Sequence, residues 1–120
     1  MKLFFDGGYS PAAGMATALV VGGRAEINRD LGPGGSMAAE WLALIAAMRA
    51  AHALCLTDAL LLGDAAAVIA QANGTAKCPP DCARYLETFG ALPRPPGRVR
   101  LRWIKRTQNL AGIALARTPI

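Results

Sequence analysis

The way in which the apolar segments are connected constrains the fold of this chain more than any other feature. At the start of the chain, segments at residues 2–5, 14–22 and 24–32 are predicted as strands separated by glycine-containing turns, and Gly22-Gly23 predicts a tight hairpin. After residue 36 the apolar segments are separated by stretches with helical spacing. The order βββαβα(α)βα predicts an α/β fold, with a mixed sheet and helices on its faces.

The second part of the chain supplies the helices and two further strands. Residues 37–54 carry apolar side chains at helical spacing, and Ser36 is the expected N-cap. Residues 59–62 are entirely apolar, as expected for a parallel strand that is buried on both faces. The remaining elements are a helix over 65–72, a helix over about 81–92, a strand from Arg98, and a last helix from Asn109, its cap, to about Arg117.

Length and composition limit the kind of protein this is. At 120 residues we expect one domain, residues 1–120, with the oligomeric state open and a monomer favoured. The net charge of +5 and the pI near 9.6 favour a polyanionic partner. An odd count of 3 cysteines indicates free thiols and a cytoplasmic location. Charged residues interrupt the long apolar stretch at 37–56, so we expect no membrane contact.

Three acidic residues are candidates for a shared site. Taken singly, Asp6 suits a turn, Glu40 suits the first turn of a helix, and Asp64 suits a helix cap. Taken together, Asp6 and Asp64 each end a strand, and Glu40 lies on a helix that must pack on the same sheet. Such a cluster suits a hard divalent cation, with Mg²⁺ as the best fit. Two ions about 4 Å apart would promote phosphodiester hydrolysis.

Four segments resemble a known family. FFDGG, AAEWLALIAAMRAA, LLLGDAAAVIAQANG and VRLRWIKRTQNLAGIALA resemble, in order, the blocks of the type 1 ribonuclease H family in its shorter, reverse-transcriptase-like form. The resemblance implies a five-stranded mixed sheet and cleavage of the RNA strand of RNA/DNA hybrids with two Mg²⁺ or Mn²⁺ ions. It implies that Asp6 contacts both ions, that Glu40 holds one of them, and that Asp64 is the acid at the end of the fourth strand.

The sequence also departs from the family pattern. In register, Ile113 occupies the place of the fourth metal-binding aspartate, and the neighbouring Gly112 costs about 1 kcal/mol of helix propensity, which predicts a poorly formed last helix. Met37 replaces a residue of a turn that contacts ribose hydroxyls, and Ala65 replaces a small hydroxyl residue. His52 lies in the middle of a helix and cannot serve as the family's mobile-loop histidine. These departures predict weakened cleavage, or a non-catalytic module that binds nucleic acid or protein.

Further residues are candidates for contact with an RNA/DNA hybrid or another nucleic-acid duplex. The resemblance assigns Arg106 and Asn109 to this role, and Ser36 retains a hydroxyl at the start of the first helix. Gly7 would leave bare backbone beside a metal and a phosphate. Ser10 either contacts a sugar-phosphate backbone or makes the turn.

The last strand carries a basic run and an aromatic residue. The cations suit either a solvated edge strand or phosphate contact, and the sequence does not separate the two. Trp103 shares a strand face with Val99 and Leu101, which favours a core position over base stacking, and Trp41 is expected in the core as well. The basic run consists of Arg98, Arg100, Arg102, Lys105 and Arg106.

Overall fold

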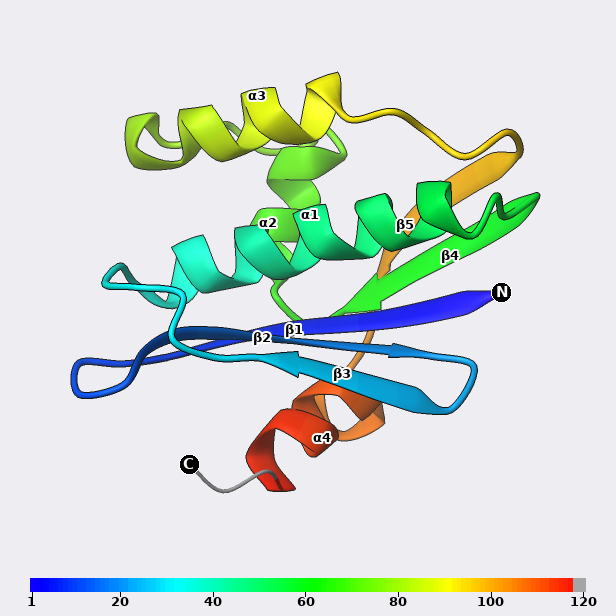
Figure 1. The fold of residues 1–120 in the computed structure, drawn as a ribbon. Coiled ribbons are helices and arrows are strands. Elements are labelled where there is room, and N and C mark those ends of the chain that lie inside the picture. The colour runs from blue at the N-terminus through cyan, green and yellow to red at the C-terminus, as the bar shows by residue number, and fades with distance from the viewer. Residues whose placement is uncertain (118–120) are drawn as a thin grey trace.

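Five strands form a mixed sheet. They are β1 (Lys2–Ser10), β2 (Gly14–Val21), β3 (Arg24–Asn28), β4 (Asp58–Gly63) and β5 (Arg98–Trp103). The computed structural model, which describes residues 1–117, places them in the order β3-β2-β1-β4-β5 (Figure 1). β1 pairs antiparallel with β2 and parallel with β4, β3 pairs antiparallel with β2, and β5 pairs parallel with β4. The predicted α/β class and mixed sheet are therefore confirmed.

Helices cover both faces of this sheet. Figure 1 shows α1 (Ser36–Ala53) and α3 (Ala83–Ala91) on one face, and α4 (Leu110–Arg117) on the opposite face. The short α2 (Ala66–Ala72) follows β4 and connects towards α3 through a 3₁₀ turn at Pro80–Cys82. Among the described residues, no helix is long and apolar enough to cross a membrane.

The larger hydrophobic core lies between α1 and the sheet. Trp41 and Leu44 of α1 are completely buried, together with Leu3 of β1 and Leu61 of β4. The Trp41 ring meets Phe89 of α3 edge-on, with 6.0 Å between ring centroids. Burial of each large side chain of this kind contributes about 1.5–3 kcal/mol, so this core fixes the position of α1 over β1 and β4.

The last helix is well formed, although we predicted a poorly formed one. It packs on the opposite face of the sheet, where Ala111 is completely buried against Ala18 and Val20 of β2. Gly112 lies inside this helix without breaking it. Tertiary contacts outweigh the low helix propensity of one glycine.

β1 is longer than predicted, and this changes the place of Asp6. The sequence predicted a strand over 2–5 that ends at Asp6, whereas the pairing with β2 continues from Asp6–Ala18 to Ser10–Gly14. Gly7 and Gly8 therefore belong to the strand and not to a turn. Asp6 lies inside a strand between two neighbours, and its interpretation as a turn residue was wrong.

Three predicted features of the helices also differ. Ser36 is the first residue of α1 and makes no capping hydrogen bond, because Gly35 takes the N-cap position. The helix expected over about 81–92 begins as the 3₁₀ turn and becomes α-helical only from Ala83. Asp64 does not cap α2 either, since the N-cap there is Ala65, without a side-chain hydrogen bond. Its carboxylate is left for another role.

Candidate metal centre

Asp6 and Asp64 lie level on neighbouring parallel strands. Phe4 of β1 pairs with Leu62 of β4; two residues further along the chain are Asp6, inside β1, and Asp64, directly after β4. Because the strands run in the same direction, both acids reach the same side of the sheet at its middle. Strand pairing alone therefore brings these two carboxylates together.

Glu40 reaches the same place because α1 lies unusually close to β1. A Cβ added to Gly7 would lie 2.3 Å from the carbonyl carbon of Ala39, so only glycine permits this approach. The backbone N–H of Gly7 donates a hydrogen bond to Oε1 of Glu40. Gly7 thus positions Glu40, in addition to any contact of its own with a ligand.

The three carboxylates form one cluster. One oxygen from each of Asp6, Glu40 and Asp64 lies within 4.8 Å of the others, and all three side chains are partly buried. Burial and the charge of Asp64 raise the pKa of Asp6 from 3.8 to about 6. Burial and the charge of Asp6 raise the pKa of Glu40 from 4.5 to about 8. The cluster therefore disfavours full ionisation unless positive charge compensates it.

Three interactions also act on the acids. The positive charge of Arg106 lowers the pKa of Asp6, and the Gly7 N–H lowers the pKa of Glu40. A hydrogen bond joins the two carboxyl groups, with protonated Glu40 as the donor; it lowers the pKa of Asp6 and raises that of Glu40. Oxygen donors at this spacing, with excess negative charge, fit Mg²⁺ or Mn²⁺ bound together with water.

The acids line a pocket of about 590 Å³ beneath the N-terminus of α1. Ser36 lies at its rim, and Arg106 and Thr107 enter from the turn that precedes α4. Ile113 lines the α4 side, at the position where the resemblance leads one to expect a fourth carboxylate. A hydrocarbon side chain there supplies no ligand, and among the described residues the cluster consists of the three acids.

Gly112 keeps α4 close to the acids. A Cβ at this position would lie 3.3 Å from Oδ2 of Asp6, tighter than an ordinary contact. Because Gly112 has no side chain, α4 can approach Asp6 closely, and no side chain from this position contacts the Asp6 carboxylate. The sequence showed Gly112 only as a cost in helix propensity, because the partner that it accommodates is far away in the chain.

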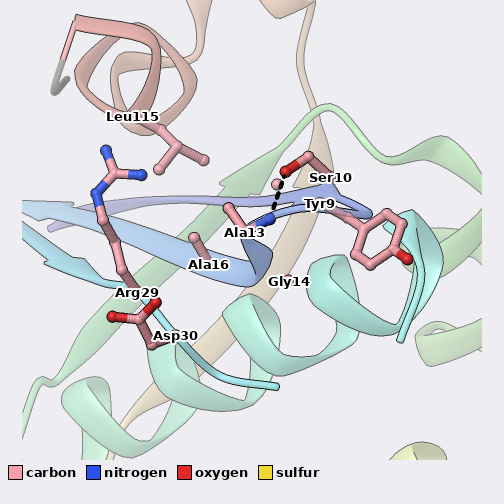
Figure 2. Close-up of a pocket in the computed structure, with 9 residues that line it drawn as sticks. Tyr9, Ser10, Ala13, Gly14, Ala16, Arg29, Asp30 and Leu115 are labelled. Carbon is pink, nitrogen blue, oxygen red and sulfur yellow. Dashed lines mark hydrogen bonds between the residues drawn. The ribbon is translucent and has the colours of Figure 1, made fainter. Parts of the chain in front are cut away.

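Two predicted nucleic-acid contacts have local structural roles. Ser10 lies at the end of β1, where its Oγ accepts a hydrogen bond from the Ala13 N–H at 3.0 Å (Figure 2). Asn109 is completely buried; its Nδ2 donates to the carbonyl of Phe5 at 3.0 Å, and its Oδ1 accepts from Ala111 N–H at 3.1 Å. Asn109 caps α4, as predicted, and ties it to β1. This burial argues against direct contact between Asn109 and a duplex.

The structure adds residues that sequence reasoning missed. Thr107 and Gly8 both line the pocket. A hydroxyl directly after Arg106 was a signal for Thr107. Gly8 gave no separate signal, because the Gly-Gly pair was interpreted as a single feature. The exposed indole of Trp103, which bonds to the backbone of Asp64, contradicts the predicted core position.

The sheet carries α4 on the face opposite α1, and acids from β1, α1 and the end of β4 meet beside it. This arrangement defines an RNase H-like domain. A profile of the family described as reverse transcriptase-like matches residues 12–118, and the chain belongs to this family. No curated protein matches the sequence.

Solved structures agree with this assignment. RNase H1 from the halophilic archaeon Halobacterium salinarum is 26% identical, with a TM-score of 0.79 over 95% of this chain and 92% of that one. The N-terminal RNase H domain of a Mycobacterium tuberculosis protein is 23% identical, with a TM-score of 0.75 over 97% and 95%. LC11-RNase H1, solved in complex with an RNA/DNA hybrid, is 17% identical, with a TM-score of 0.74 over 95% and 91%.

Proposed function

We propose that this protein is a metal-dependent endoribonuclease that cleaves the RNA strand of RNA/DNA hybrids. The observation that carries the proposal is the convergence of Asp6, Glu40 and Asp64 within 4.8 Å at the floor of an open pocket. The similarity to RNase H1 structures, one of them solved with an RNA/DNA hybrid, supports the choice of substrate.

In this proposal the acids hold Mg²⁺ or Mn²⁺, with Asp6 central because it contacts both neighbours. Bound ions would polarise the scissile phosphate and lower the pKa of the attacking water. Glu40 stays oriented through its bond from the Gly7 N–H. The guanidinium of Arg106, close enough to Asp6 to lower its pKa, holds a phosphate at the pocket rim. The Ser36 hydroxyl, also at the rim, contacts the sugar of the same strand.

The missing fourth acid weakens the proposed activity. With Ile113 in the pocket wall, water or substrate oxygens must complete the coordination of a second ion. We therefore expect slow cleavage in Mg²⁺ and a need for high Mn²⁺. The same residue favours the second candidate function, an inactive RNase H-like module that binds nucleic acid or a protein partner without cleavage.

Cleavage of a labelled RNA/DNA hybrid in Mg²⁺ and in Mn²⁺ tests the proposal. The wild type should cleave the RNA strand, whereas Asp6→Asn and Asp64→Asn should lose activity. Asp58→Asn is the matched control, because Asp58 lies at the opposite end of β4 in an exposed pair with Arg100. Equal rates in all four proteins would contradict the proposed site.

A metal titration followed by NMR separates the two candidate functions. Shifts at the amides of Asp6, Gly7 and Asp64 would support the nuclease. Salt-sensitive binding of the hybrid without cleavage, and without these shifts, would favour the inactive module.

A further inference from the structure

Trp103 is an exposed aromatic residue that contacts the backbone of Asp64. It is the last residue of β5, and 52% of it is exposed, whereas Trp41 is completely buried. Trp103 is the first residue after the buried Leu101 on the same strand face, and it ends β5. A half-exposed tryptophan next to a candidate site has apolar surface available for a ligand.

The indole is held in place by the segment that carries Asp64. Its Nε1–H donates to the backbone carbonyl of Asp64 at 3.2 Å. The next backbone N–H, of Ile104, donates to the carbonyl of Gly63 at 2.9 Å. Two hydrogen bonds thus connect the end of β5 to the end of β4, so the ring is held at a defined place beside the backbone of Asp64. A fixed ring loses little conformational entropy when a ligand packs against it.

Cations flank Trp103 in the sequence. Arg102 precedes Trp103, Lys105 follows two residues later, and both side chains are exposed. Arg106 continues the series into the pocket itself. An exposed ring in the same segment as exposed cations is complementary to a sugar-phosphate backbone, since the ring suits the sugar and the cations suit the phosphates.

We propose that Trp103 contacts the nucleic-acid substrate: its indole packs against a sugar next to the phosphate held at the acids, while Arg102 and Lys105 contact flanking phosphates. The location of the bound strand rests on the proposed function. The contact itself requires binding only and does not depend on cleavage. Sequence reasoning favoured a core position for Trp103, and the structure replaces that position with a contact surface.

Tryptophan fluorescence in EDTA tests the contact without cleavage. Since Trp41 is completely buried, a change in emission or acrylamide quenching on addition of a labelled hybrid reports on Trp103. Fluorescence anisotropy of the labelled hybrid follows binding independently. We expect the hybrid to bind, and to shield Trp103 from acrylamide.

Variants measure the contribution of the ring. Trp103→Ala should weaken hybrid binding about fivefold, the lower end of aromatic contacts with nucleic acid. Trp103→Phe keeps a ring but loses the N–H, and should retain most of the affinity. Leu54→Ala is the control, because Leu54 is 53% exposed at the far end of α1 and should not affect binding.

The outcomes separate this inference from the proposed function. Hybrid binding that leaves Trp103 accessible, or equal loss in the alanine and phenylalanine variants, would overturn the contact and leave the nuclease proposal standing. Shielding of Trp103 without cleavage in any metal would support the contact and overturn the nuclease. Failure of the hybrid to bind would overturn both.

Discussion

Replacement of Glu40 by glutamine should stabilise the metal-free protein at alkaline pH. Burial and the nearby Asp6 raise the pKa of Glu40 from 4.5 to about 8 in the folded protein. A carboxyl group whose pKa rises on folding contributes its full stability below its unfolded pKa and loses it as the pH rises through the folded value. Glutamine carries no charge at any pH, so Glu40→Gln should not show this loss.

The size of the effect follows from the pKa change. The difference between 4.5 and about 8 corresponds to at most about 5 kcal/mol. Because Glu40 is partly exposed, solvent screens the repulsion, and we expect about 2 kcal/mol in the free energy of unfolding. For a chain of 120 residues this is a difference in melting temperature of about 8 °C.

Thermal unfolding in EDTA, from about pH 4 to about pH 9, measures the effect. The melting temperature of the wild type should fall relative to Glu40→Gln as the pH rises through about 8. Glu87→Gln is the matched control, because Glu87 is exposed on α3, away from the cluster. Addition of Mn²⁺ at alkaline pH should stabilise the wild type more than Glu40→Gln.

A wild type and a Glu40→Gln variant with parallel pH profiles in EDTA would refute this reasoning. Burial and the charge of Asp6 would then not act on Glu40 as its position indicates. A smaller gain from Mn²⁺ in the variant remains a separate test of Glu40 as a ligand.

Three further predictions follow from the pocket walls. Gly7→Ala should destabilise the fold by about 3 kcal/mol or more in urea unfolding because its Cβ meets backbone, whereas Gly8→Ala should cost about 1 kcal/mol or less because its Cβ meets a flexible leucine end; similar costs would contradict the close approach of α1. Asn109→Ala should cost about 3 kcal/mol in the same assay through the lost cap and an unpaired carbonyl, and an unchanged midpoint would contradict its structural role. Ile113→Asp should lower the Mg²⁺ concentration for half-maximal hybrid cleavage about tenfold, with Ile113→Asn as the uncharged control, and equal behaviour of the two would contradict a vacant ligand position.

The sequence predicted the order of the elements well because that order depends on local patterns. The Gly22-Gly23 hairpin, the helical spacing after Ser36 and the apolar run of β4 each show in a few consecutive residues. Because the sequence placed an acid at the end of each of two strands expected to be neighbours, it also predicted that Asp6 and Asp64 would lie close together. The structure confirms their proximity, although Asp6 lies inside β1 and not at its end.

The sequence did not predict features that depend on distant partners. Pairing with β2 extends β1 beyond Gly7, and Asn109, which the sequence predicted as a cap and a nucleic-acid contact, is completely buried and bonded to Phe5. Trp103 alternates correctly with Val99 and Leu101, but 52% of it is exposed in the structure. Strand alternation gives the face of a residue, and only the neighbouring elements decide whether that face is covered.

By itself, then, the sequence determined the α/β order and the identity of the three acids, because both follow from local spacing and residue type. The tertiary structure decided how close the acids lie, because that distance depends on the approach of α1 over Gly7 and on the register of β1 with β4. It also decided that α4 presents Gly112 and Ile113 to the pocket, without a fourth carboxylate. Contacts between segments far apart in the chain set these distances, and they do not appear in any short stretch of sequence.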